Sequence, residues 1–273
     1  MSKIVFIDDF PDGFGGSEFV NNTFCKMFNI SKIVAANSIF EFNPETLYAV
    51  GNISTMTKSQ IDNLSKHPNY VILEHDYKFI NTRHPWRYED SVVPSNLVIN
   101  TSLYANAKAI FTQTDDHTEV FRKNQIEGNF ISLKSSLWSE DELSELTTFY
   151  KKYPKKISEF CVLKSNNWIK NTKGALEFCR QSKLNYNLIS STSNRKEFLN
   201  TLSQYCCLVF FPIARESFCR LIIEAKCMGL NVITSPNSGA WQSEWYGSKS
   251  GLELISFLKS QTEANIKIIS EYL

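Results

Sequence analysis

The 273-residue sequence predicts an α/β protein built from two domains of similar size, each with a parallel sheet. Short apolar runs alternate with helix-like stretches through the first half, and the same alternation resumes in the second half. Between the halves, the charged segment 151–156 interrupts the pattern with a proline. Alternation of strands and helices is typical of a parallel sheet covered by helices on both faces. The length suits two small domains.

The first half opens with a compact apolar run at 3–8, which predicts a buried strand running into a glycine-rich loop that ends at Gly15 and Gly16. A helix is expected from Ser17 to about Phe28. Thr114 or Asp115 is the expected N-cap of a later helix. The remaining elements are strands at 32–36, 47–51, 70–74, 109–113 and 130–133, and helices at 57–67 and 114–124.

In the second half, Ser139 and Glu142 have the spacing of a capping box and predict the start of a helix. The elements after it are strands at 157–163, 186–190, 207–212 and 231–234, and helices at 172–182, 195–204, 217–228, 251–260 and 262–273. We place the domain junction within 134–156. The domains are then 1–135, 136–258 and a final helical segment, 259–273, that packs back on the first domain.

Composition and charge exclude several classes of protein. The formal net charge is +1, so no overall field attracts the chain to nucleic acid or to a membrane. The seven cysteines are odd in number and form no C-x-x-C, which predicts reduced thiols rather than disulfides or a zinc site. The N-terminus does not resemble a signal peptide, and the apolar run 206–214 is too short to span a membrane. We therefore expect a cytoplasmic protein.

The strongest chemical signal is a pair of glutamates, Glu216 and Glu224, around the predicted start of a helix. At the helical rise their spacing corresponds to about 12 Å, so one carboxylate can lie near a sugar and the other near the ribose of the same nucleotide sugar. The free N–H groups of the helix N-terminus suit phosphate oxygens. Alternatively, Glu216 is a first-turn acid and Glu224 is solvated. The apolar neighbours Ile222, Ile223 and Ala225 argue that Glu224 has a partner.

The segment 212–233 resembles the E-x7-E signature of retaining GT-B glycosyltransferases, specifically glycosyltransferase family 4. The residues that carry the resemblance are Pro212, Glu216-Ser217-Phe218, Glu224-Ala225, Gly229 and Val232-Ile233. The resemblance implies two Rossmann-like domains that face a cleft. It also implies that Glu216 contacts hydroxyls of the donor sugar and that Glu224 holds the ribose. The family usually has Gly-Leu where Cys219-Arg220 stands, so the role of Arg220 stays open.

The main-chain amides at Ser217 and Phe218 are, by the same resemblance, expected to meet the sugar and the phosphates of the donor. Gly15-Gly16 resembles the first-loop motif of the family, whose backbone approaches the diphosphate. Taken alone, it is equally a plain β–α turn. Ser238-Gly239-Ala240 partly resembles the family's glycine-rich stretch after the last strand of the donor domain.

Basic residues expected at the diphosphate follow the first strand of the second domain. Lys173-Gly174 resembles the family's Lys-Gly, where the lysine neutralises the diphosphate and the charge on the leaving group. A further basic residue often lies upstream, for which Lys164 and Lys170 are both candidates. His75 matches a family histidine that touches the donor sugar, or is a satisfied histidine at a strand end.

No metal or other cofactor is expected. The sequence has no D-x-D of the kind that holds a diphosphate-bound metal in glycosyltransferases of the other large fold. The adjacent pairs Asp8-Asp9 and Asp115-Asp116 are expected to cap helices or face solvent. The nucleotide-diphosphate sugar is a substrate, and lysines and helix N-termini would supply the positive charge.

The acceptor is suggested by the segment 74–90, where basic and aromatic residues interleave. The candidate contacts are Tyr77, Lys78, Arg83, Trp86 and Arg87. Such residues can stack on a sugar or a base while contacting phosphate, or the segment simply covers the cleft.

The compact chain also resembles small phage-encoded glycosyltransferases, some of which modify hydroxymethylated pyrimidines in DNA. This resemblance suggests hydroxymethylated DNA as one acceptor, and a glycan, a lipid-linked sugar or a small metabolite remains equally open. The near-neutral charge argues against DNA, although the lysines of 151–156 offer a local basic patch.

The combined prediction is a retaining hexosyl- or pentosyltransferase that uses a nucleotide-diphosphate sugar. Two alternatives remain. A nucleotide-sugar epimerase of the same fold would rearrange the donor with no acceptor present. A non-catalytic protein would bind a nucleotide sugar without releasing the nucleotide.

Overall fold

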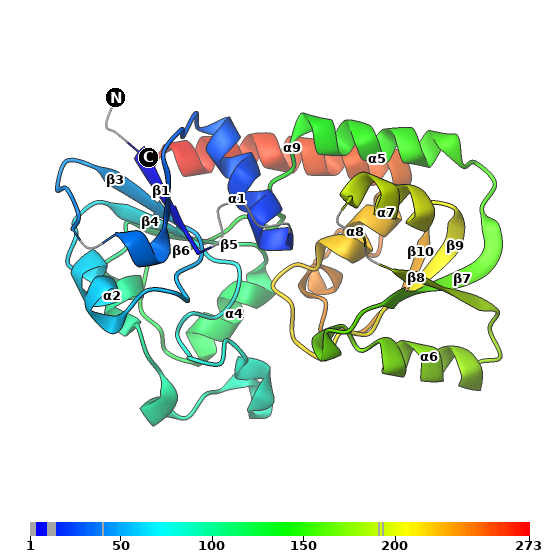
Figure 1. The fold of residues 1–273 in the computed structure, drawn as a ribbon, viewed down its shortest axis with the longest axis horizontal. Coiled ribbons are helices and arrows are strands. Elements are labelled where there is room, and N and C mark those ends of the chain that lie inside the picture. The colour runs from blue at the N-terminus through cyan, green and yellow to red at the C-terminus, as the bar shows by residue number, and fades with distance from the viewer. Residues whose placement is uncertain (1–3, 10–14, 40, 191, 193) are drawn as a thin grey trace. The chain divides into compact units, whose positions relative to one another are not determined.

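The computed structural model describes residues 4–9, 15–39, 41–190, 192 and 194–273. The chain divides into two compact units, which are treated separately below. The first comprises Met1–Leu137 with Glu263–Leu273, and the second comprises Trp138–Thr262. Each unit is an α/β structure around a parallel sheet (Figure 1), so the predicted α/β fold with two Rossmann-like units is confirmed.

The sheet of the first unit has six parallel strands in the order β2-β1-β3-β4-β5-β6. The central strand β1 aligns Phe6 with Ile33 on one side and with Ala49 on the other. The strands are β1 Ile4–Asp8, β2 Ile33–Ala35, β3 Leu47–Val50, β4 Tyr70–Leu73, β5 Ala109–Thr112 and β6 Phe130–Ser132. The helices are α1 Gly16–Met27, α2 Lys58–Ser65, α3 Thr101–Ala105 and α4 Asp115–Lys123.

Both faces of this sheet are buried, because successive side chains of each strand enter different cores. Ile7 and Ile72 join the core beneath α2, α3 and α4, whereas Phe6 and Val71 join the core beneath α1. Ile269, near the end of the chain, belongs to the α1 core. The predicted helices and strands of this half are thus driven by burial on two sides.

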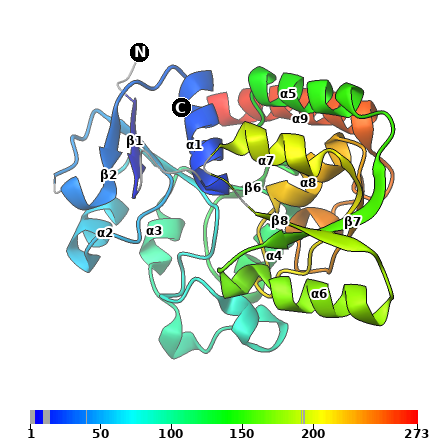
Figure 2. The same ribbon diagram turned by 45° about the vertical axis from the view of Figure 1, so that its right-hand side comes forward.

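The sheet of the second unit has four parallel strands in the order β10-β9-β7-β8. The strands are β7 Ile157–Lys164, β8 Tyr186–Ser190, β9 Tyr205–Val209 and β10 Asn231–Ile233. The helices are α5 Glu140–Lys152, α6 Thr172–Gln181, α7 Arg195–Leu202, α8 Arg220–Cys227 and α9 Gly251–Ser270, of which the residues from Glu263 onward belong to the first unit. Figures 1 and 2 show α6 on one face of this sheet and α7 and α8 on the other.

Strand β7 illustrates how this sheet is covered. Val162 packs with Ala175 and Cys179 of α6, whereas Cys161 and Leu163 enter the large core on the opposite face. The order of the strands reverses beside β7, because β8 follows on one side and β9 on the other. Ligands of open parallel sheets bind at the carboxyl ends of the strands where the order reverses. In the second unit that position is the edge where β7 and β9 end.

The structure corrects two predicted helices. Helix α8 begins at Arg220 rather than at Ser217, because Cys219 before it has a left-handed backbone with φ 69°. The expected helices 251–260 and 262–273 form one helix, α9, since nothing between Ser260 and Thr262 breaks it. The short helix α3 was not expected.

Two local predictions about helix caps are confirmed. Ser139 and Glu142 form the capping box of α5, and Thr114 caps α4 by accepting a hydrogen bond from the His117 amide. All seven cysteines are free thiols. Among the residues that the structure describes, no helix is both long and apolar enough to cross a membrane.

Candidate functional site

Three loops are hydrogen-bonded together at the edge of the second sheet where the strand order reverses. The loop after β9 meets the loop after β7 through the Ile213 amide, which donates to the Ile169 carbonyl at 2.8 Å. It meets the loop after β10 through the Glu216 amide, which donates to the Asn237 carbonyl at 2.7 Å. Glu216 therefore lies on a supported backbone and not on an isolated loop.

The loop after β10 approaches the Glu216 backbone so closely that a glycine is required. A Cβ at Gly239 would lie 2.4 Å from the Ser217 carbonyl oxygen and 2.5 Å from that of Glu216. The Gly239 amide donates to the Glu216 carbonyl at 2.9 Å. Gly239 thus fixes the position of Glu216 through main-chain packing.

Glu216 forms an ion pair with Lys170, whose Nζ lies 2.7 Å from Oε1. The Lys170 side chain is 36% exposed and the Glu216 side chain 18% exposed, so solvent and a ligand reach both. Burial lowers the pKa of Lys170, but the charge of Glu216 outweighs it and raises the pKa above its usual value. Of the two upstream lysines considered in the sequence, Lys170 is the one that the structure brings to Glu216.

Lys164 and Lys173 do not join this pair. Lys164 is the exposed last residue of β7, and Lys173 is exposed in the first turn of α6. The glycine after Lys173 has a packing explanation. Asn171 caps α6 by accepting a hydrogen bond from the Gly174 amide at 3.1 Å, and a Cβ at Gly174 would meet the Asn171 side chain.

The residues between Glu216 and α8 differ in what they offer to a ligand. Phe218 is 1% exposed and packs near Trp138 and Trp245, so its side chain is part of the core and any donor contact must use its main chain. Ser217 is partly exposed. The side chain of Cys219, the N-cap residue of α8, makes no capping hydrogen bond. Helix N-terminal amides of this kind suit a phosphate oxygen.

Glu224 has the partner that its apolar surroundings predict. Arg195 of α7 donates from Nη2 to Glu224 Oε1 at 2.8 Å, and Arg220 Nε lies 3.7 Å from the same oxygen. Glu224 is buried on α8. Sequence reasoning missed Arg195 because it lies far from Glu224 along the chain and on another helix.

In the first unit, His75 is held by two amide side chains. Asn21 donates to Asp8 Oδ2 at 3.0 Å, which orients its own Oδ1 toward His75 Nε2 at 2.6 Å. Nε2 must therefore carry the proton, and Nδ1 accepts from Gln113 Nε2 at 3.1 Å. Burial, with the nearby charge of Lys78, lowers the pKa of His75 to about 3. The predicted contact with a donor sugar would require Asn21 or Gln113 to release this ring.

The prediction that Tyr77 and Lys78 contact an acceptor is corrected by their burial. Lys78 is fully buried, with Nζ 2.6 Å from Oε1 of the equally buried Glu74 and 3.3 Å from Asp76 Oδ1. Tyr104 donates its hydroxyl to Glu74 Oε2 at 2.8 Å. Tyr77 packs against rings inside the same unit and is 2% exposed.

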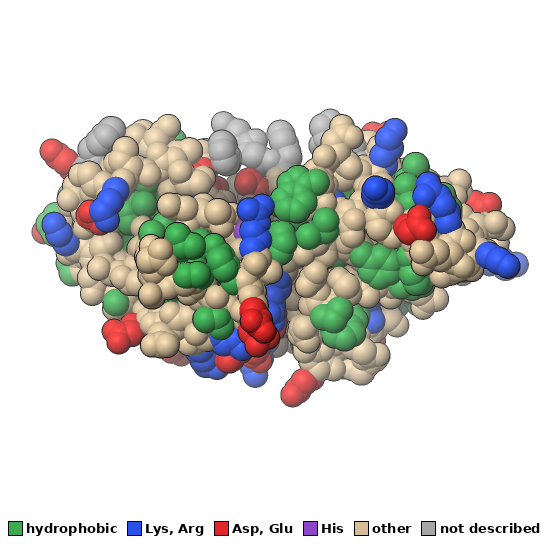
Figure 3. All heavy atoms as spheres, turned by 90° about the horizontal axis from the view of Figure 1, so that it is seen from below, with side chains coloured by type: hydrophobic (Ala, Val, Ile, Leu, Met, Phe, Trp, Pro, Cys, Tyr) green, Lys and Arg blue, Asp and Glu red, His purple; other side chains and the backbone are tan. Residues whose placement is uncertain are grey.

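The other predicted acceptor residues lie closer to the surface. Arg83 donates from Nη1 to both carboxylate oxygens of Asp76, at 2.9 and 3.0 Å. Trp86 is partly exposed, and the guanidinium of the exposed Arg87 lies 5.7 Å from the centre of its ring. Figure 3 views the molecule from the side on which this segment lies in Figure 1, and hydrophobic, basic and acidic side chains are mixed there.

Two further predictions concern the end of β1. Asp8 and Asp9 were expected to cap or face solvent, but both are buried. Asp9 accepts hydrogen bonds from the amides and hydroxyls of Ser54 and Thr55, which joins the end of β1 to the loop after β3.

The glycine-rich loop is described only in part. Gly15 is the N-cap of α1 with φ −88°, and Gly16 begins that helix. Residues 10–14 of the predicted loop lie outside the described residues.

Comparison with known proteins gives structural matches only. No protein-family model matches the chain, and no curated protein matches it by sequence. The structure of Anabaena HepE in complex with UDP-glucose matches with a TM-score of 0.54 and 11% identity over 98% of this chain and 91% of that chain. HepE in complex with UDP and glucose matches with a TM-score of 0.51 and 11% identity, over 96% and 89%.

An α,α-trehalose-phosphate synthase (UDP-forming) from Burkholderia vietnamiensis matches with a TM-score of 0.50 and 8% identity over 93% of this chain and 77% of that chain. The likeness extends over both units and confirms the predicted GT-B fold class. At these identities it speaks to the fold alone, and membership of family 4 remains a prediction.

Proposed function

We propose that the chain is a glycosyltransferase that moves a sugar from a nucleotide-diphosphate sugar to an acceptor hydroxyl. The observation that carries the proposal is the Lys170–Glu216 ion pair, 2.7 Å long and open to solvent, beside the N-terminus of α8, where the Cys219 side chain makes no capping hydrogen bond. It lies at the edge of the sheet where ligands of such folds bind. Structures of similar fold were solved with UDP-glucose and with UDP, and the similar trehalose-phosphate synthase is UDP-forming.

Each residue of the site then has a role in binding the donor. Lys170 moves its ammonium from Glu216 toward the diphosphate, and Lys173 adds a second positive charge. When Lys170 contacts the diphosphate as well as Glu216, the Glu216 carboxylate can accept hydrogen bonds from hydroxyls of the sugar. Amides at the start of α8 meet phosphate oxygens, and Glu224 accepts from the ribose. Because lysines and amides neutralise the diphosphate, we propose that no metal is essential.

The reaction breaks the bond between the anomeric carbon and the diphosphate oxygen. The electron pair of that bond leaves with the nucleoside diphosphate, and Lys170 stabilises the charge that develops there. The acceptor hydroxyl forms the new bond to the anomeric carbon and gives its proton to the departing phosphate oxygen. Retention at the anomeric carbon follows from the family resemblance. Arg83, Trp86 and Arg87 are proposed to contact the acceptor, a glycan or hydroxymethylated DNA.

The first experiment is thermal unfolding of the chain with UDP, GDP, ADP and their glucose conjugates, with EDTA and then with magnesium. Binding to the folded state raises the unfolding temperature. We expect a shift with one nucleotide series that EDTA leaves unchanged. Incubation of that donor with simple glycans and with hydroxymethylcytosine DNA should release the nucleoside diphosphate. Absence of any shift would refute the proposal.

Variants then test the site itself. Lys170→Met and Glu216→Gln should each lower kcat/KM by about 100-fold, the usual loss when one charge-stabilising group is removed. Lys183→Met is the matched control, because Lys183 is exposed in the turn that precedes β8, at the other end of the strands. Rearranged donor without acceptor would instead indicate an epimerase. Binding with no nucleotide release would indicate a non-catalytic protein.

A further inference from the structure

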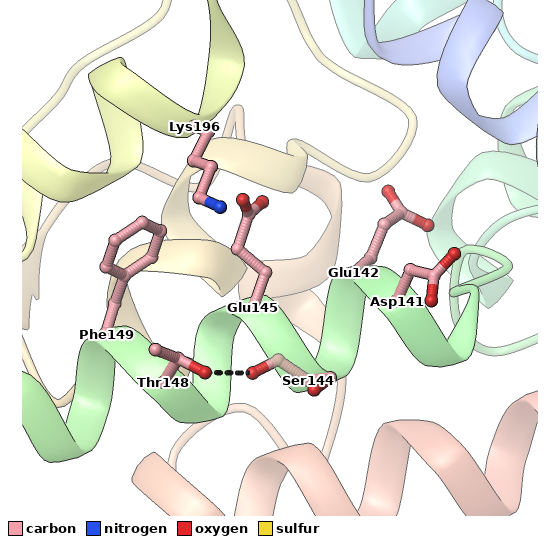
Figure 4. A pocket seen from close by; sticks show the side chains of 7 residues that line it. All are labelled: Asp141, Glu142, Ser144, Glu145, Thr148, Phe149 and Lys196. Atoms are coloured by element: carbon pink, nitrogen blue, oxygen red, sulfur yellow. Dashed lines mark hydrogen bonds between the residues drawn. The ribbon is translucent and has the colours of Figure 1, made fainter.

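The surroundings of Glu224 form a charged cluster that involves three helices of the second unit. Glu142 and Glu145 come from α5, Arg195 begins α7, and Arg220 and Glu224 lie on α8. Figure 4 shows the Glu145 side chain extending from α5 toward Lys196 of α7, with Glu142 farther along α5, at a pocket of about 390 Å³. The cluster therefore contains three carboxylates and two guanidinium groups.

The two arginines are held differently. Arg220 donates from Nη2 to Glu142 Oε1, and its Cζ lies over the Trp138 ring, 3.7 Å from the ring centre. Its nearest approach to Glu224 is the longer 3.7 Å contact of Nε. Arg195 bridges α5 and α8, donating from Nη1 to Glu145 at 2.9 Å and from Nη2 to Glu224 at 2.8 Å. Arg195 is thus the arginine that directly orients Glu224.

Only one of the two carboxylate oxygens of Glu224 contacts the arginines. Both arginines approach Oε1, whereas Oε2 has no hydrogen-bond or ion-pair partner within the described part of the chain. The side chain is 9% exposed, and Oε2 is not among the fully buried polar atoms that lack a partner, so this oxygen keeps contact with solvent. A carboxylate oxygen that keeps contact with solvent can exchange water for the hydroxyls of a ligand. Two neighbouring hydroxyl groups of a ligand can both donate hydrogen bonds to Oε2.

We propose that Arg195 is a positioning residue that fixes Glu224 through Oε1, so that Oε2 accepts hydrogen bonds from the 2′- and 3′-hydroxyls of the bound nucleotide. The inference rests on the proposed function, because it needs a nucleotide at this site. Without Arg195, Glu224 faces Glu142 and Glu145 with Arg220 as the remaining cation of the cluster. Its carboxylate then turns away from its fixed orientation, and selection for the ribose hydroxyls is lost while diphosphate binding by the lysines persists.

The experiment measures binding by calorimetry for UDP, GDP and ADP and for the 2′,3′-dideoxy form of each. The ratio of the two affinities reports contact with the hydroxyls and does not depend on the fraction of folded protein. The wild-type chain should prefer the ribose form by about 10- to 100-fold, the range for hydrogen bonds to a charged group. Arg195→Met should reduce this preference to below about 3-fold by weakening the ribose form alone, and Arg195→Lys should retain part of it.

The matched control is Arg180→Met, since Arg180 is an exposed arginine on α6 whose pair with Glu177 is 3.5 Å long. It should leave the preference unchanged. If Arg195→Met weakens both forms equally, or weakens neither, Arg195 has only a structural role and the inference is wrong while the proposed function stands. If the wild-type chain binds none of the three nucleotides, both are wrong.

Discussion

Each unit holds a charged cluster next to strand ends, and the two clusters differ in how much of their hydrogen-bonding capacity is used. In the first unit, Glu74 and Lys78 are fully buried and are surrounded by Tyr104, Asp76 and Arg83. In the second unit, Lys170 and Glu216 pair at a similar distance but stay open to solvent. A saturated buried cluster supports the fold, whereas an open pair can exchange partners with a ligand.

The pKa shifts follow the same division. Burial raises the pKa of Glu74 to about 7 against the opposing charge of Lys78. Burial also lowers the pKa of His117 to about 4. Lys170 instead becomes more basic, because the charge of Glu216 outweighs its burial. Desolvation thus decides the direction of the pKa shifts of Glu74 and His117, whereas the ion pair decides that of Lys170. Substitution should affect stability in the first case and activity in the second.

The largest expected effect is the loss of Lys78. Lys78→Met leaves Glu74 buried without its counter-charge, which should lower the free energy of unfolding by about 3–5 kcal/mol. Lys170→Met, at an exposed pair, should change it by less than about 1 kcal/mol. Urea denaturation of the two variants measures the contrast. Adding Glu74→Gln to Lys78→Met should restore most of the loss, and equal instability of the single and double variants would contradict this account.

The next effect is a fall in stability as the pH is lowered from about 6.5 to 4.5. The folded chain keeps His75 and His117 neutral, because burial lowers their pKa values to about 3 and about 4, whereas the unfolded chain protonates both. Their stabilising contribution is thus present above pH 6.5 and is lost as the pH falls. Burial raises the pKa of Glu74 to about 7, so the folded chain binds a proton at Glu74 in the same pH range. This proton cancels the effect of one of the two histidines. The net slope should be about 1 kcal/mol per pH unit.

Urea denaturation at several pH values measures this slope. His117→Gln keeps a donor for the Asp76 carbonyl, which His117 Nε2 contacts at 2.9 Å, and removes one titrating group. The remaining histidine and Glu74 should then nearly cancel, so most of the slope should disappear. A slope as steep in the variant as in the wild-type chain would mean that these histidines do not control the response of the first unit to acid.

A smaller effect on stability is expected from a substitution of Gly239, whose close packing holds the backbone of Glu216 in place. Gly239→Ala should lower the free energy of unfolding by about 1–3 kcal/mol, because the new Cβ overlaps main-chain carbonyls that cannot rotate away. Gly247 is the control, since a Cβ there meets nothing within 4 Å. Gly247→Ala should change stability by less than about 0.5 kcal/mol. Equal effects at the two positions would show that the loops beside Glu216 adapt easily.

The fold was predictable because its signals are local. Most strands of the first sheet are short apolar runs buried on both faces. The edge strand β8, Tyr186–Ser190, is mostly exposed, yet it was also predicted with its observed bounds. Errors arose where one residue changes the backbone path. The left-handed Cys219 delays the start of α8, and no periodicity reveals it. The missing break between Ser260 and Thr262 left α9 continuous, because the sequence there is compatible with a helix on both sides.

The site was less predictable because its pairs depend on tertiary structure. Lys164 and Lys170 were equivalent in the sequence, and the left-handed turn at Asn171, φ 52°, is part of the loop that brings Lys170 to Glu216. The partnership of Arg195 with Glu224 has no local signal. By contrast, the sequence did contain a signal for the ion pair of Lys78, because Glu74 lies four positions before it. The interleaved aromatic residues had suggested a surface instead.

The smallest effect tests whether the start of α8 is strained. Cys219 lies in the left-handed region, with φ 69° and ψ 73°. In this region a residue with a Cβ has a conformational energy about 1 kcal/mol higher than in the right-handed region. Cys219→Gly should therefore be more stable than Cys219→Ala by about 1 kcal/mol, since both lose the thiol and only glycine loses the strain. Cys179, buried within α6, provides the control, because there alanine should exceed glycine by about 1 kcal/mol. Thermal and urea unfolding of the four variants measures both differences. If alanine is the more stable residue at both positions, Cys219 is not strained, and the cysteine does not destabilise the second unit relative to glycine.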